Sequence, residues 1–179
     1  MPQHNKANIY LIGYRCTGKT SVGKLLAAMM DKPFVDADVL LEKEAGKTIA
    51  QLVEQEGWEG FRKREKELLA RLAQAENHVI APGGGIVLDP ENVALMKGSG
   101  LVAWLRASED VVASRMAQDG KTAGQRPSLT GVGVLEEIRA VMEKRQPLYQ
   151  AAADLEVDTG SLSVPEVCAR ILAKAGFLS

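Results

Sequence analysis

The amino-acid sequence predicts an α/β protein with three layers, in which a five-stranded parallel sheet lies between two layers of helices. Five short apolar segments alternate with longer segments whose apolar residues recur at the spacing of a helix. The first apolar segment is followed by a glycine-rich turn and a helical segment, an order typical of phosphate-binding sites. The length of 179 residues suggests one domain over residues 1–179.

The elements follow one another in a regular order. Strands are expected at residues 9–12, 34–36, 79–81, 101–105 and 155–158. Helices are expected at residues 19–30, 39–45, 49–56, 59–75, 92–96, 109–118, 135–149 and 166–174. Two helix starts have capping-box spacing, Thr48 with Gln51 and Ser163 with Glu166. Because short strands separated by helices pair in parallel, helices should cover both faces of the sheet.

The composition excludes several classes of partner. A net charge of −1 provides no positive surface for nucleic acid or an anionic membrane. No segment approaches the roughly 20 apolar residues of a membrane span, and residues 1–8 do not form a secretory signal. Cys16 and Cys168 are typical of two reduced thiols rather than a disulfide framework. We therefore expect a cytoplasmic protein that acts on small molecules, and we take it to be a monomer.

Residues 13–20 are the most informative part of the chain. Their sequence, Gly-Tyr-Arg-Cys-Thr-Gly-Lys-Thr, fits the P-loop pattern G-x-x-x-x-G-K-[ST], in which backbone N–H groups and a helix N-terminus hold phosphates. The side chain of Lys19 would reach the β- and γ-phosphates, and the Thr20 hydroxyl would hold magnesium. The expected contacts of the nucleoside triphosphate are Gly13, Cys16, Thr17, Gly18, Lys19, Thr20 and Ser21.

The P-loop indicates a nucleotide but not the group that receives its phosphate. The strand at residues 101–105 runs into Arg106, so a Walker-B aspartate is not obvious, and no N-K-x-D element for guanine is present. The chain is also too short for a motor ATPase with its coupling elements. These features favour a kinase that acts on a small molecule.

Asp36 and Asp38 form a second cluster just past the second expected strand. Ligands of an open parallel sheet bind at the carboxyl ends of its strands, so this loop should lie beside the P-loop. One carboxylate would hold magnesium, and the other would accept a hydrogen bond from an attacking hydroxyl and act as its base. The alternative is that Asp38 only caps a helix starting at Val39, which leaves Asp36 unexplained.

Two arginines lie on stripes that are otherwise apolar. Arg62 is three residues from Glu65, which falls on the core-facing stripe of the helix at residues 59–75. Arg145 falls between Val141 and Leu148 on the apolar face of the helix at residues 135–149, close to Pro147, which should kink or end that helix. Arginine matches a carboxylate in bidentate fashion, so both fit an acceptor acid. The alternatives are an ion pair at the edge of the core for Arg62 and snorkelling to solvent for Arg145.

Two glycine-rich loops complete the candidate site. Residues 119–133 hold several glycines and few apolar residues, a pattern typical of a mobile lid over an active site or of a plain connector. Arg126 in this lid would stabilise the charge of the transferring phosphoryl group. Gly83, Gly84 and Gly85 follow the third expected strand, where they either let backbone N–H groups approach a ligand or only form a tight turn.

The ordered set of these motifs resembles the shikimate kinase family over essentially the full length. The matching pieces are the P-loop, Asp36 with Asp38, the run from Gly57 to Glu65, the three glycines, Arg126-Pro127-Ser128-Leu129-Thr130-Gly131, and Arg145 before Pro147-Leu148-Tyr149. The resemblance implies a nucleoside-monophosphate-kinase-like P-loop fold. It also implies ATP-dependent phosphorylation of the 3-hydroxyl of shikimate, giving shikimate 3-phosphate and ADP in chorismate and aromatic amino-acid biosynthesis.

The resemblance also implies a role for each matching residue. Lys19, Asp38 and Arg126 would be catalytic, and Thr20 and Asp36 would bind Mg²⁺, with ATP as co-substrate. Arg115 and Arg126 would join the P-loop in ATP binding. The residues expected around shikimate are Asp38, Arg62, Glu65, Gly83, Gly84, Gly85 and Arg145. One departure is Ala81-Pro82 before the glycines, where the family often has Thr-Gly.

Two other functions fit part of the same pattern. Another small-acceptor P-loop kinase, acting on gluconate or a nucleoside monophosphate, would share the P-loop, and gluconate also has a carboxylate and hydroxyls. A nucleotide-binding switch without turnover would need neither Asp38 nor inward arginines. The ordered motif set favours shikimate over both.

Overall fold

The computed structural model of the chain describes residues 8–119 and 133–177. The expected lid at residues 119–133, including Arg126, therefore lies almost wholly outside the described residues. Within the described ranges, no helix is long and apolar enough to cross a membrane.

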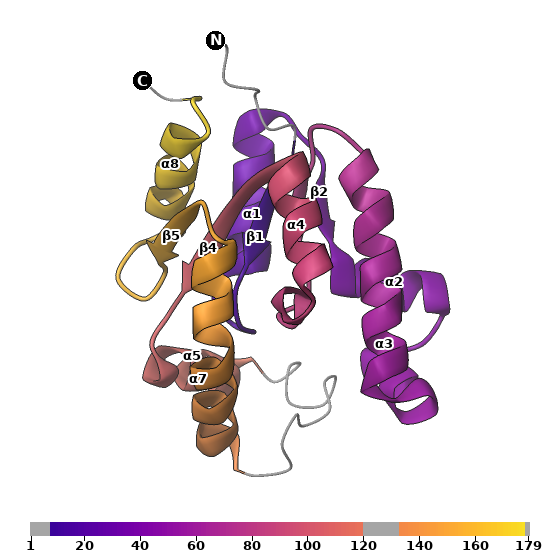
Figure 1. Cartoon of the computed structure of the whole chain (residues 1–179). Coiled ribbons are helices and arrows are strands. Elements are labelled where there is room, and N and C mark those ends of the chain that lie inside the picture. Colours follow the sequence, from indigo (N-terminus) through magenta and orange to yellow (C-terminus); the bar gives the residue numbers. More distant parts are fainter. Residues whose placement is uncertain (1–7, 120–132, 178–179) are drawn as a thin grey trace.

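The sheet has five parallel strands, as the sequence predicted, and the structure places them in the order β2-β3-β1-β4-β5 (Figure 1). The strands are β1 (Asn8–Ile12), β2 (Phe34–Asp36), β3 (Val79–Ala81), β4 (Gly100–Arg106) and β5 (Leu155–Asp158). β3 lies between β1 and β2 in the sheet, so the P-loop after β1 and the loop after β2 follow strands that are not neighbours. α1 nevertheless packs on both β3 and β2, and Thr20 in its first turn contacts Asp36 at the end of β2.

Helices cover both faces of the sheet, which confirms the three-layer prediction (Figure 1). One face packs against α1 (Lys19–Met30) and α8 (Val164–Lys174) through an apolar core that includes Leu11, Leu26 and Ile171. The other face packs against α3 (Ile49–Gln74), α4 (Pro90–Ser99) and α7 (Val134–Ala152). The remaining described helices are α2 (Ala37–Ala45), the 3₁₀ helix η1 (Ile86–Leu88) and α5 (Glu109–Gln118). α5 packs on α7 beneath the P-loop.

Both expected capping boxes are present, at the starts of α3 and α8. The two helices predicted at residues 49–56 and 59–75 form one continuous span, α3, broken by the backbone of Gly57 (φ 70°, ψ 175°). This left-handed φ costs glycine little because it has no Cβ, so the chain turns here without an intervening loop. The turn sets the direction of the second half of α3, which carries Arg62.

Two predictions about helix ends were wrong. α2 begins at Ala37 rather than Val39, because Asp36 and not Asp38 is its N-cap. α7 passes through Pro147 and ends at Ala152. Pro147 and Glu143, the residue four positions before it, are both exposed, so the missing N–H lies on the solvent side of the helix, and the buried side chains of Tyr149 and Ala152 hold the last turn against the sheet. Leu148, placed on the apolar face by the sequence, is exposed.

Candidate active site

The P-loop, residues 13–20, joins the end of β1 to the start of α1. Three of its residues have positive φ angles, Gly13 at 147°, Cys16 at 59° and Gly18 at 99°. The first turn of α1 receives no side-chain cap from Gly18, so its N–H groups are open to an anion. The Nζ of Lys19 donates to the carbonyls of Gly13 (2.7 Å) and Tyr14 (2.8 Å), which holds the ammonium across the loop. Ser21 is exposed in the same turn.

Thr20 and Asp36, the expected magnesium residues, are in direct contact. The Thr20 hydroxyl donates to Oδ2 of Asp36 at 3.0 Å. Oδ1 of Asp36 accepts from the backbone N–H groups of Asp38 (3.1 Å) and Val39 (3.3 Å), as the N-cap of α2. The interpretation of Asp38 as a simple cap is thus wrong. A hydroxyl and a carboxylate oxygen beside a phosphate cradle are the hard donors that Mg²⁺ takes, so these two residues fit the ion.

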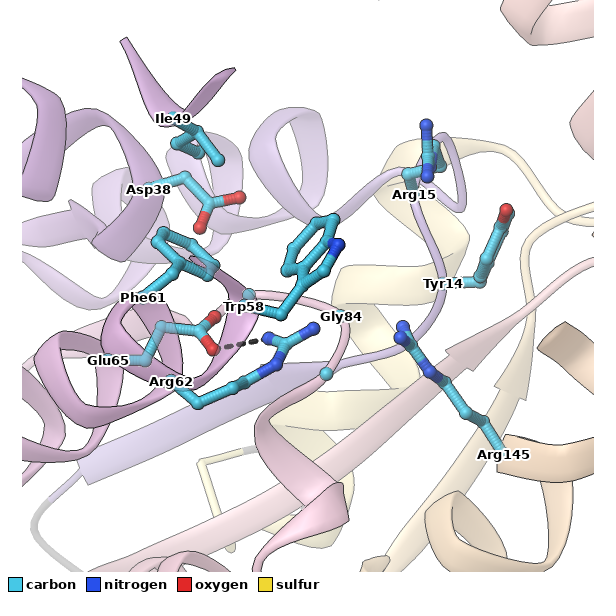
Figure 2. Close-up of a pocket in the computed structure, with 12 residues that line it drawn as sticks. Tyr14, Arg15, Asp38, Ile49, Trp58, Phe61, Arg62, Glu65, Gly84 and Arg145 are labelled. Carbon is cyan, nitrogen blue, oxygen red and sulfur yellow. Dashed lines mark hydrogen bonds and ion pairs between the residues drawn. The ribbon is translucent and has the colours of Figure 1, made fainter. Parts of the chain in front are cut away.

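A pocket opens at the carboxyl edge of the sheet beside the P-loop (Figure 2). All seven residues expected around the acceptor line it: Asp38, Arg62, Glu65, Gly83, Gly84, Gly85 and Arg145. They come from α2, from the second half of α3, from the loop after β3 and from α7. Residues more than 100 positions apart in the sequence therefore share one concave site.

Arg62 and Glu65 form an ion pair on the pocket side of α3 (Figure 2). Glu65 is only 4% exposed, whereas Arg62 keeps part of its surface open. The guanidinium of Arg62 also lies over the rings of Trp58 (5.3 Å) and Phe61 (5.5 Å). The two aromatic rings meet edge to face at 5.9 Å. These contacts hold the guanidinium at the pocket wall in one orientation.

Arg145 enters the pocket from α7, on the opposite side of Gly84 from Arg62 (Figure 2). Arg145 is only 8% exposed, so the interpretation of its side chain as one that snorkels to solvent is wrong. Two guanidinium groups on opposite sides of Gly84 are suited to bind a carboxylate or a phosphate between them.

The glycine loop lies between these charged groups and admits no side chain there. A Cβ at Gly83 would meet the carboxylates of Glu65 and Asp38, and one at Gly85 would overlap the Arg62 guanidinium. The hydroxyl of Tyr149 donates to the carbonyl of Gly84 and fixes the loop against α7. The glycines therefore allow the backbone to pass through the site, which goes beyond a tight turn.

The profile of the family described as "Shikimate kinase" matches residues 15–175 of this chain. The shikimate kinase of Rhodopirellula baltica is 42% identical over 174 residues, covering 97% of this chain and 91% of that protein. The shikimate kinase of Syntrophus aciditrophicus is 40% identical and covers 96% and 92%. The solved structure of shikimate kinase from Acinetobacter baumannii in complex with shikimate is 31% identical, has a TM-score of 0.87 and covers 97% and 96%.

The chain belongs to the shikimate kinase family. A gluconokinase from Sinorhizobium meliloti also resembles it, with a TM-score of 0.58 but 18% identity, so the likeness to that enzyme shows the fold alone. The family and the fold expected from the motifs are confirmed. The roles of the single residues stay predictions that the geometry makes specific.

The pocket of this shikimate kinase family member has further walls that the sequence did not indicate. Tyr14, Arg15, Ile49 and Trp58 also line it. Arg15 pairs with Glu137 of α7 at 3.2 Å, and both side chains are buried. Tyr14 and Arg15 occupy variable positions of the P-loop pattern, so no motif could select them. Arg115, which was expected to join in ATP binding, donates to the Cys16 carbonyl of the P-loop and to the Thr159 carbonyl after β5, so it lies beside the nucleotide cradle.

Glu65, which lines the pocket, has a strongly raised pKa, so its protonation couples folding stability to pH. Burial raises its pKa from 4.5 to about 7, with the Arg62 charge opposing and the Asp38 charge adding to the increase. The folded protein therefore binds this proton more tightly than the unfolded chain. Stability from Glu65 is fully present below pH 4.5 and is lost as the pH rises through about 7.

We expect wild-type stability to fall relative to that of Glu65→Gln as the pH rises from about 5 to 8, by on the order of 3 kcal/mol at most. The glutamine stays neutral, so it does not bear the cost of a buried charge. Urea unfolding of both proteins at several pH values measures the difference. Glu67→Gln removes an exposed carboxylate from the same helix and should follow the wild type. Parallel curves for Glu65→Gln and the wild type would contradict the linkage.

Proposed function

We propose that this chain phosphorylates shikimate, moving the γ-phosphoryl group of ATP to the 3-hydroxyl and giving shikimate 3-phosphate and ADP. The observation that carries the proposal is that the P-loop and the acceptor pocket lie side by side at the carboxyl edge of the sheet. Asp38, Arg62 and Arg145 surround a space that opens beside the phosphate cradle. The relative from Acinetobacter baumannii, solved in complex with shikimate, covers nearly the whole chain. Enzymes with this transfer belong to aromatic amino-acid biosynthesis.

On the donor side, the P-loop N–H groups and Lys19 bind the phosphates of ATP. The Nζ of Lys19 already lies across the loop, so it exchanges carbonyl partners for phosphate oxygens without a large movement. Thr20 and Asp36 would hold Mg²⁺, which neutralises phosphate charge when bound. Arg126, outside the described residues, stays a predicted contact of the transferring group.

On the acceptor side, Arg62 and Arg145 bind the carboxylate of shikimate from opposite sides of Gly84. Asp38 accepts a hydrogen bond from the attacking hydroxyl and takes its proton as the phosphoryl group is transferred. Asp38 is 9% exposed and lies in the first turn of α2, where its side chain lines the acceptor pocket. Because Asp38 lines the same pocket as both guanidinium groups, a hydroxy acid held by its carboxylate at Arg62 and Arg145 presents a hydroxyl to Asp38.

We further propose that the chain works as a single-domain monomer in the cytoplasm, with ATP and shikimate as its small-molecule partners. The two thiols support a reducing compartment, since half-buried Cys16 and buried Cys168 are both free of disulfide bonds. Analytical ultracentrifugation of the purified chain at micromolar concentration tests the monomer directly.

A coupled ADP-release assay over an acceptor panel tests the reaction. With ATP and Mg²⁺, we expect turnover with shikimate and less than about 1% of that rate with gluconate or a nucleoside monophosphate, since gluconate has no ring and a nucleoside monophosphate has no carboxylate. An assay without acceptor measures background ATP hydrolysis. Turnover with gluconate or a nucleotide but not with shikimate would overturn the proposal.

A further inference from the structure

Thr159, in the loop after β5, contacts the P-loop although no sequence motif includes it. Its hydroxyl lies 2.7 Å from the carbonyl oxygen of Thr17 and 3.2 Å from that of Arg106. Its backbone N–H donates to the same Arg106 carbonyl at 2.8 Å. The residue is only 5% exposed. The hydroxyl has one proton, and the shorter distance directs it to Thr17.

Arg115 of α5 completes the contact. Its Nη1 lies 3.2 Å from both the carbonyl of Cys16 and the Thr159 hydroxyl, and its Nη2 donates to the Thr159 carbonyl at 2.6 Å. The Thr159 hydroxyl therefore accepts from Arg115 and donates to Thr17. Two consecutive P-loop carbonyls, those of Cys16 and Thr17, are held from the outside of the loop by a connected hydrogen-bond network.

The direction of these carbonyls determines where the following N–H groups point. In a trans peptide, the C=O of one residue and the N–H of the next point in opposite directions. Fixing the carbonyls of Cys16 and Thr17 toward Arg115 and Thr159 thus turns the N–H groups of Thr17 and Gly18 toward the inside of the loop, where phosphates bind.

The backbone at Cys16 is strained, and the hydrogen-bond network stabilises this strained conformation. Cys16 has a φ of 59°, which costs a residue with a Cβ about 1–2 kcal/mol. Strained conformations persist where surrounding contacts determine them. Gly18, two residues on, also has a positive φ, and the segment between them carries both tethered carbonyls.

We propose that Thr159 is a positioning residue for ATP, which acts by holding the Thr17 carbonyl so that the Gly18 N–H points at the donor phosphates. The inference deepens the proposed function and rests on it, because it assumes that the P-loop binds the phosphoryl donor. Thr159 itself contacts neither the acceptor pocket nor the expected magnesium residues among the described contacts.

Two matched pairs of variants isolate the hydroxyl. Thr159→Val keeps the shape of the wild type without the hydroxyl, and Thr159→Ala lacks only the hydroxyl of Thr159→Ser. We expect the dissociation constant for ADP, measured by calorimetry with Mg²⁺ and no acceptor, to rise on the order of tenfold in the valine and alanine variants. Thr159→Ser should stay within about threefold of the wild type. The KM for the acceptor at saturating ATP should change by less than about twofold in all folded variants.

A further variant separates positioning from general stability. Thr48→Val removes the capping hydroxyl of α3, far along the chain from the P-loop, and should lower the melting temperature with ADP affinity unchanged. The inference is overturned if Thr159→Val and Thr159→Ala bind ADP as tightly as the wild type, or if Thr159→Ser weakens as much as Thr159→Ala. If Thr159→Val does not fold, the serine and alanine pair decides.

The two proposals fail separately in these experiments, because ADP binding needs no acceptor. Weakened ADP binding in Thr159→Val, in a chain whose wild type does not phosphorylate shikimate, would overturn only the proposed function. Turnover with shikimate together with unchanged ADP affinity in the variants would overturn only the positioning role of Thr159.

Discussion

Replacing Asp38 with asparagine is expected to lower kcat by about 10²–10⁴-fold, the range typical of a lost general base. The amide has the size of the carboxylate but does not take a proton from the attacking hydroxyl. Asp38 lies beside the glycine loop and Glu65, at the end of the pocket nearer the magnesium residues. In the proposed arrangement ATP contacts the P-loop and not this side chain, so the dissociation constant for ADP should change by less than about threefold. Steady-state kinetics and calorimetry measure the two quantities.

A matched control for Asp38→Asn is available on α5. Asp110→Asn makes the same substitution at an exposed position of the first turn and should keep kcat within about twofold. If Asp38→Asn retains more than a tenth of wild-type kcat, Asp38 only positions the hydroxyl, since a loose transition state needs little help from a base. A nucleotide switch without turnover would show no effect of either variant.

Replacing Arg145 with alanine is expected to weaken acceptor binding by about 2–5 kcal/mol, with a much smaller change in KM for ATP. The guanidinium is buried in the pocket, so its removal leaves the acceptor carboxylate without half of its positive surroundings. Arg62→Ala should act in the same direction. The effect of Arg62→Ala is harder to interpret, because this substitution also leaves buried Glu65 without its partner and uncovers Trp58. The KM for each substrate at saturation of the other measures the effect.

Arg139→Ala provides the control for Arg145. Arg139 is an exposed arginine of the same helix, paired on the surface with Glu109, and should leave both KM values within about twofold. An acceptor KM that stays at its wild-type value in both Arg145→Ala and Arg62→Ala would contradict the carboxylate site. The proposed substrate orientation would then need another source of positive charge, and Arg15 also lines the pocket.

Much of the fold followed from local patterns. The five strands lie within one residue of their predicted positions, because each is a short apolar run bounded by turn residues. The start of α2 and the end of α7, which were predicted at Val39 and Tyr149, were misjudged for a different reason. Whether Asp36 or Asp38 caps α2, and whether α7 ends at Pro147, depends on contacts with Thr20 and with the sheet. Those contacts come from residues distant in the sequence.

The sequence by itself determined the chemistry of the donor and the types of residue at the acceptor. The P-loop, Asp36 with Asp38, and the arginines on apolar stripes are local patterns. In them, residue type and spacing already indicate a bound ligand or the energetic cost of burying a charged side chain. Only the tertiary structure decided which further groups share the site. Arg15, Trp58 and Thr159 gain their places from the strand order and from the break at Gly57. These arrangements depend on how distant segments pack, and spacing along the chain does not encode the directions in which side chains meet.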